Sequence, residues 1–69
     1  MSWAALDPER RELAEELLTP KQLEVFRYWL DGHSNATIAR ALDLDESAVR
    51  RRLARALRRI GPHLNRDAA

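Results

Sequence analysis

A chain of 69 residues has room for one small domain, because folding at this size buries only about 60% of the chain surface. It contains no cysteine, which excludes disulfide bonds and thiolate zinc sites. The formal net charge is only +1, but the charge is unevenly distributed along the chain. Residues 1–34 contain four basic residues and seven acids, whereas residues 35–69 contain eight arginines and four acids. This asymmetry suggests one face for an anionic polymer and another for a different partner, with a solvated arginine-rich helix end as the plainer alternative.

Membrane insertion and export are not expected. The longest apolar run covers residues 3–6, far below the roughly 20 residues that span a bilayer. The N-terminus lacks the basic segment and long apolar core of a signal peptide. We therefore expect a cytoplasmic protein. Two glycines, three prolines and few β-branched residues favour an all-α fold, with residues 1–69 forming a single domain.

The first predicted helix spans about residues 8–18. Asp7 is a favourable N-cap, and the proline after it is tolerated at the first helical position, where its missing N–H would have no partner. Leu13 and Leu17 share one face of this helix, and Leu6 joins them from before the cap. We expect this face to be the buried one.

The second predicted helix begins after Thr19. Thr19 and Gln22 have the spacing of a capping box, and Leu18 and Leu23 have the spacing of a hydrophobic staple. Gly32 is expected to end the helix. The residues predicted to face the core are Val25, Phe26, Trp29 and Leu30.

The third predicted helix is capped by Ser34 and runs to about Leu42. Its small residue Ala39 permits a close crossing with the next helix. The turn that follows needs a left-handed residue, usually glycine, and Asp43 occupies that place. We expect the side chain of Leu44 to insert into the core and so to anchor the turn. The inner side of the third helix is formed by Ile38, Ala39 and Leu42.

The fourth predicted helix covers residues 45–60. Asp45 is its expected N-cap, and Leu44 and Val49 form a second staple. Gly-Pro at 61–62 is expected to end the helix and leave residues 61–69 as a short tail. The apolar stripe comprises Val49, Leu53, Ala56, Leu57 and Ile60. The opposite stripe comprises Ser47, Arg50, Arg51, Ala54 and Arg58, with Arg52, Arg55 and Arg59 on its flanks.

Such a helix suits the major groove of DNA. Arginine donates twice to a guanine edge, and small residues let the backbone approach. Flanking arginines suit phosphates, which position a protein without reading sequence. The third and fourth predicted helices, joined by a tight turn, have the layout of a helix-turn-helix.

Residues 19–26 and 31–39 resemble the DNA-binding domain of LuxR/GerE-type regulators. Residues 48–60 are more similar to region 4 of bacterial sigma factors. These are neighbouring groups with the same tetrahelical design, and the resemblance covers a core at about residues 18–60. The chain departs from the usual pattern at Asp43, where glycine is common, and at position 48, where an alanine replaces threonine.

The resemblance implies a division of contacts. The residues implied to meet bases are Glu46, Ser47, Arg50 and Arg51. Those implied to contact phosphates are Ser34, Thr37, Arg52 and Arg55. Members of both families usually carry further domains, so by analogy a stand-alone domain suggests a small repressor or activator, carried by a phage or mobile element.

We therefore expect a sequence-specific regulator of transcription that reads double-stranded DNA with the helix at residues 45–60. The alternative is a sigma-region-4-like module that binds RNA polymerase or a sigma factor, which the acidic first helix favours. Apolar residues upstream of the core suggest a homodimer through the first helix; the competing account is that this helix completes the monomer core. These residues are Trp3, Leu6, Leu13 and Leu17.

No cofactor, metal or catalytic site is expected. His33 and His63 are thirty residues apart and have no cysteine or paired carboxylate at ligand spacing. Ser34 and Ser47 sit at helix starts, where capping or groove contacts outrank a nucleophilic role. The sequence therefore predicts a binding protein and not an enzyme.

Overall fold

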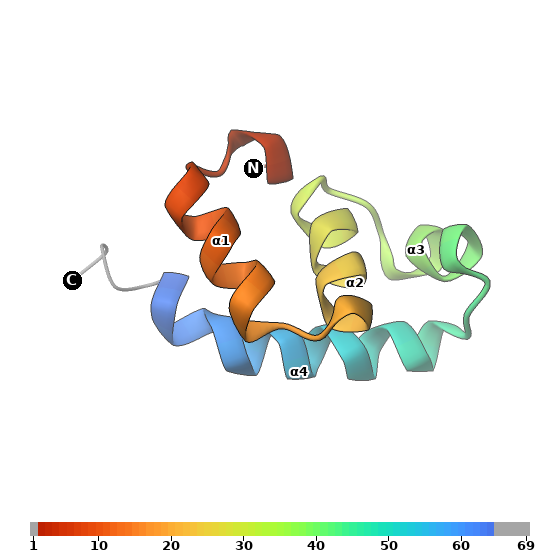
Figure 1. The fold of residues 1–69 in the computed structure, drawn as a ribbon. Helices are drawn as coiled ribbons and strands as arrows, with labels where there is room; N and C mark the ends of the chain where they lie inside the picture. Colours follow the sequence, from red (N-terminus) through yellow and green to blue (C-terminus); the bar gives the residue numbers. More distant parts are fainter. Residues whose placement is uncertain (1, 65–69) are drawn as a thin grey trace.

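The computed structural model describes residues 2–64. This part of the chain forms a short 3-10 helix followed by four α-helices, and it contains no strand (Figure 1). The elements are η1 (Trp3–Ala5), α1 (Pro8–Leu17), α2 (Pro20–Leu30), α3 (Asn35–Leu42) and α4 (Glu46–Leu64). The predicted all-α class with four helices is confirmed, and η1 is an addition to it. None of the helices described is long and apolar enough to cross a membrane.

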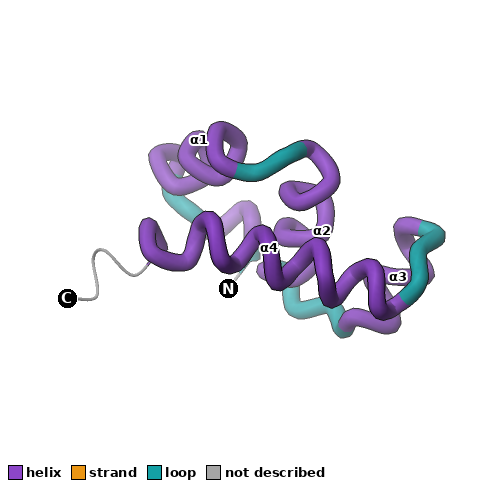
Figure 2. Tube along the Cα trace, turned by 90° about the horizontal axis from the view of Figure 1, so that it is seen from below, coloured by secondary structure: helices purple, strands orange, loops and turns teal. Residues whose placement is uncertain are grey.

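The longest helix, α4, organises the other three. It packs against α1, α2 and α3 (Figure 1). Seen from below, α4 lies across the front of the molecule, with α1 and α3 toward its two ends (Figure 2). One side of α4 therefore faces away from the core along its length.

Side-chain hydrogen bonds start the first three α-helices where the sequence places them. The carboxylate of Asp7 accepts the N–H of the third residue of α1 at 2.9 Å. Thr19 and Gln22 exchange the two bonds of a capping box, each at 3.2 Å. The hydroxyl of Ser34 accepts the N–H of Thr37 at 3.2 Å. These bonds satisfy N–H groups that have no partner within the helix.

Left-handed residues end α2 and α3. Gly32 has a φ of 92°, and Asp43 has a φ of 55° and a ψ of 51°. After Gly32, the next N–H returns to the carbonyl of Tyr28 at 3.2 Å; after Asp43, the N–H of Leu44 returns to the carbonyl of Ala39 at 2.8 Å. Both ends have the hydrogen bonding of a Schellman motif. The prediction that Asp43 takes the glycine position of the turn is confirmed.

The core consists of two apolar clusters joined through α2 and α4. The cluster beside α1 contains Leu6, Ala14, Leu18, Phe26, Leu30, Ala56 and Ile60. The cluster beside α3 contains Val25, Ile38, Ala39, Val49 and Leu53. Leu57 packs against both clusters. The first half of α4 is thus fixed against α3 and its second half against α1, which sets the orientation of the outer face.

The predicted inner face of α1 is wrong in part. Ala14 and Leu18 are buried, at 0% and 5% exposure, and they form the centre of the contact. Leu17 is half-buried against the same cluster, while Leu13 is only half-buried and belongs to neither cluster. A small alanine at the contact lets α1 approach its neighbours closely. Periodicity in leucine alone therefore misplaced the inner face.

Trp29 is not in the core, contrary to the prediction. Its side chain is 39% exposed, although its ring stacks on Phe26 with 6.0 Å between ring centroids. Trp29 is one residue from the end of α2, and Figure 1 shows α2 rising away from α4 toward that end. The spacing is that of a core residue, but too little protein surrounds the end of α2 to cover an indole.

The predicted end of the fourth helix is also wrong. The helix continues through Gly61 and Pro62 to Leu64. Pro62 lacks the N–H that would bond to the carbonyl four residues earlier, and its ring crowds that carbonyl. The loss falls in the last turn of α4, where few bonds remain to be broken. Positions 61–64 of the predicted tail are therefore helical, and positions 65–69 lie outside the described residues.

Candidate nucleic-acid interface

The turn between α3 and α4 sets the geometry of the site. Ala39 and Val49, at 7% and 0% exposure, belong to the same apolar cluster, and Leu44 packs against it from the turn. The carbonyl of Asp45 accepts the N–H of Val49 at 3.1 Å, which places Asp45 immediately before α4. A side-chain cap by Asp45 stays a prediction. The predicted inner positions of Ala39 and Val49 are confirmed, so α3 and α4 cross as in a helix-turn-helix.

The outer face of α4 follows from the buried one. At about 100° per residue, the exposed positions lie away from the apolar stripe. The exposed members are Glu46, Ser47, Arg50, Arg51, Ala54, Arg55, Arg58 and Arg59. Arg52 is half-buried and lies at the edge of this face. All four residues predicted to meet bases are therefore exposed on one helix, at its N-terminal end.

This face is strongly basic. Positions 47–63 contain six arginines and no acid. Only Arg50 is ion-paired, with 3.9 Å between its Nη1 and the Oε1 of Glu46. The other five arginines of α4 make no ion pair within the part of the chain that the structure describes. Exposed guanidinium groups without internal partners are available to phosphates and base edges.

Two of the predicted phosphate ligands are joined to each other. The hydroxyl of Ser34 accepts the backbone N–H of Thr37 at 3.2 Å and donates to its side-chain hydroxyl at 3.0 Å. The Ser34 proton is therefore in use, whereas the hydroxyl proton of Thr37 is free to donate to an oxygen outside the chain. Of the two, Thr37 is the better placed to donate to a phosphate.

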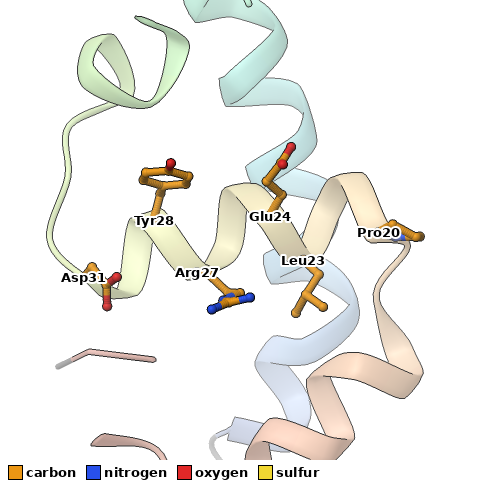
Figure 3. A pocket seen from close by; sticks show the side chains of 6 residues that line it. All are labelled: Pro20, Leu23, Glu24, Arg27, Tyr28 and Asp31. Atoms are coloured by element: carbon orange, nitrogen blue, oxygen red, sulfur yellow. The ribbon is translucent and has the colours of Figure 1, made fainter. Parts of the chain in front are cut away.

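A second surface feature lies on α2, which we call the α2 hollow. Its lining residues are Pro20, Leu23, Glu24, Arg27, Tyr28 and Asp31. Figure 3 shows Tyr28 and Glu24 on one side of α2, and Arg27 and Leu23 on the other. The charges are mixed, and the hollow contains none of the residues predicted to contact DNA. It is therefore a surface separate from the basic face of α4.

Comparison with known families decides between the two resemblances. Residues 16–60, more than half of the chain, match the family model for sigma-70, region 4. The chain belongs to the sigma-70 region 4 family. The likeness to LuxR/GerE-type regulators is not confirmed. No curated protein and no solved structure matches the chain. Domains of the sigma-70 region 4 family have a helix-turn-helix, bind DNA and RNA polymerase, and are not enzymes.

Sequence reasoning missed one local feature of this sigma-70 region 4 domain. Glu46 and Arg50 are four residues apart on one helix, which is the spacing of a surface ion pair. The spacing of the two residues along the sequence is the signal that predicts this pair. The ion pair means that the first two turns of α4 present an acid and a base together.

Proposed function

We propose that this chain is a sequence-specific DNA-binding regulator of transcription that reads the major groove with α4. The observation that carries the proposal is the row of exposed arginines without internal ion-pair partners on the helix that follows the turn. Membership of the sigma-70 region 4 family supports it independently. A buried apolar stripe holds α4 in place, so the arginine face is presented by a rigid element.

The proposed base readers are Glu46, Ser47, Arg50 and Arg51. Ser47 and Ala54 are small and exposed, so they allow the backbone of α4 to approach base edges. The proposed phosphate ligands are Ser34, Thr37, Arg52 and Arg55. Because half or more of protein–DNA hydrogen bonds go to the sugar-phosphate backbone, this second group positions the domain and the first group selects the sequence.

Selection from random duplex DNA followed by sequencing and gel shift tests the proposal. The wild type should enrich a defined site, and Arg50→Ala/Arg51→Ala should lose preference at the bases that these arginines read. Arg11→Ala/Lys21→Ala is the matched control, because it removes two positive charges from α1 and α2 and leaves α4 intact. Equal binding of the selected site by wild type and the α4 double variant would refute the groove assignment.

The second candidate function is binding to RNA polymerase or a sigma factor. The family binds RNA polymerase, and α1 presents an exposed acidic side, while the α2 hollow offers a surface apart from α4. The acids concerned are Glu9, Glu12, Glu15 and Glu16. Binding of the purified chain to polymerase core enzyme, unaffected by Arg50→Ala/Arg51→Ala and with no duplex enriched, would favour this function over DNA reading.

A homodimer through α1 stays a prediction. Uncovered apolar surface upstream of the core no longer supports it. Leu6 is 6% exposed, and Trp3 and Leu17 pack against the core of their own chain, so upstream apolar surface is covered within the monomer. Affinity still favours a dimer, because a lone helix-turn-helix makes few base contacts and specific sites usually need about 10⁻⁸ M or better. Sedimentation equilibrium at micromolar concentration decides: a monomer whose selected site has no repeat contradicts the dimer.

A further inference from the structure

The first turn of α4 contains an acid that a purely attractive DNA-binding face would not include. Glu46 is the only acid in α4, it is exposed, and it begins the helix at the end that carries the proposed base readers. A carboxylate at this position repels every phosphate that approaches. An acid therefore lowers the affinity of α4 for duplex DNA of any sequence, unless it finds a donor on a base.

Glu46 is coupled to one particular arginine. Its Oε1 lies 3.9 Å from the Nη1 of Arg50, and the two side chains remain 49% and 62% exposed. At this distance and exposure the pair is weak and opens readily. In the free protein Arg50 lies beside Glu46, and on DNA both side chains can exchange their partner for a base edge.

The major groove offers each side chain a matching group. Arginine donates to O6 and N7 of guanine, whereas glutamate accepts from the N4 amino group of cytosine. Residues four apart lie about 6 Å apart along a helix, and successive bases of a strand rise by about 3.4 Å. The two side chains therefore reach base pairs no more than about two steps apart.

We infer that Glu46 is a specificity-determining residue, which restricts Arg50 to guanines that have a cytosine within two base pairs and weakens binding everywhere else. The inference rests on the proposed DNA-binding function and names the class of site within it. Attraction to cytosine N4 and repulsion from phosphate act together, because the N4 amino group satisfies the carboxylate that binding removes from water and from Arg50, whereas in adenine the N7 acceptor beside the N6 amino group repels it.

Selection from random duplexes, run in parallel on three forms of the full chain, tests the inference. The wild type should enrich a cytosine within two base pairs of the guanine whose preference Arg50→Ala relaxes. Glu46→Ala should lose that cytosine preference by about fivefold or more, and Glu46→Gln should shift it toward adenine, the base that glutamine pairs with. Both variants should bind random duplex several-fold more tightly at low salt, because a repulsive charge is gone.

Glu12→Gln is the matched control, since it removes the same charge from an exposed position on α1. It should leave the enriched sequence unchanged and alter binding to random duplex less than twofold. Thermal melting of every variant separates a change in reading from a change in folding, because Glu46 also favours the N-terminus of α4 electrostatically. Glu46→Gln retains the shape of the side chain. It replaces Glu46→Ala in the test if Glu46→Ala melts at a lower temperature than the wild type.

The outcomes separate this inference from the proposed function. If no duplex is enriched by the wild type, both are refuted. If the wild type selects a site and Arg50→Ala relaxes a guanine, while folded Glu46→Ala and Glu46→Gln enrich the same sequence as the wild type, the proposed function stands and the role of Glu46 is overturned. A wild-type site with no cytosine within two base pairs of that guanine also overturns it.

Discussion

The backbone N–H of Trp3 donates to Oδ1 of Asp31 at 2.9 Å, which ties the start of the chain to the end of α2. The guanidinium carbon of Arg27 lies 5.0 Å from the centre of the Trp3 ring, and Leu6 is buried just beyond it. Asp31, directly after α2, and Arg27, one turn earlier in α2, thus hold η1 by a hydrogen bond and a cation–π contact. This connection is how residues upstream of the family match become part of the core.

Loss of the Asp31 carboxylate should therefore loosen the N-terminal segment. Asp31→Ala should lower the free energy of unfolding by about 0.5–1.5 kcal/mol, the usual net contribution of one hydrogen bond. Trp3→Ala keeps the backbone N–H that donates to Asp31, but it should lower the free energy of unfolding by more, because it removes the packing of the indole on the core and its contact with Arg27. Glu24→Ala is the control: it deletes an exposed carboxylate of α2 for which the structure gives no hydrogen bond, and should change stability by under about 0.5 kcal/mol. Urea unfolding measures the free energy of unfolding of all three variants. Equal effects of Asp31→Ala and Glu24→Ala would contradict a stabilising role for the hydrogen bond between Trp3 and Asp31.

Asp43 holds a conformation that suits glycine better, so Asp43→Gly should stabilise the protein. A residue with a Cβ is strained at a φ of 55°, and an acid at the C-terminal end of α3 opposes the helix dipole. We expect a gain of about 0.5–1 kcal/mol, which in a domain of this size raises the melting temperature by a few degrees. Asp43→Ala removes the same charge but keeps a Cβ. If the two variants melt alike, the left-handed strain is not the cause.

The helix-turn-helix could be read from the sequence because its signals are local. Capping residues, the small residue at the crossing and the apolar stripe of α4 all depend on neighbours within a few positions. The features that were misread depend on distant neighbours instead. Trp29 has core spacing but lacks a cover, Ala14 became the centre of the α1 contact because of what faces it, and Asp31 acquired its role from a residue twenty-eight positions away.

The crossing of α3 and α4 leaves no room for a larger side chain. Ala39→Leu should cost about 1–3 kcal/mol through overpacking and should weaken DNA binding in parallel, because the angle of α4 depends on this contact. Ala41→Leu is the matched control on the exposed side of α3 and should melt close to the wild type. Val49→Asp, which buries an unpaired charge at a fully buried position, should be more damaging. A folded Val49→Asp variant with a wild-type melting curve would mean that α4 is rotated from its described orientation.

Arg55 and Arg50 should differ in what they contribute to DNA binding. Arg55 is proposed to contact phosphate, so Arg55→Ala should weaken binding to all duplexes about equally and reduce the slope of log K against log salt by about 1. Arg50 is proposed to read a base, so Arg50→Ala should cost about 1–3 kcal/mol on the selected site and relax preference at one position. Gel shifts over a salt series on selected and scrambled duplexes measure both quantities. A position-specific loss for Arg55→Ala would reverse the assignment.

The continuation of α4 past Ile60 can be tested with two glycine-to-alanine substitutions, which should shift the melting temperature in opposite directions. Gly61 lies within the helix, and a Cβ at this position would meet no atom within 4 Å outside the two adjacent residues. The ring of Pro62 crowds a Cβ that precedes it in a helix, so the test is made in a Pro62→Ala background, where Gly61→Ala should stabilise the protein by about 0.4–1 kcal/mol. Gly32 has equally open surroundings but a φ of 92°, so Gly32→Ala should destabilise it, because alanine is strained in that conformation. Made in the same Pro62→Ala background, the two substitutions add the same methyl group to two different backbone conformations. Opposite shifts in melting temperature, relative to Pro62→Ala alone, are expected because Gly61 is helical and Gly32 is left-handed. If both variants melt below Pro62→Ala, Gly61 is not in a helical conformation.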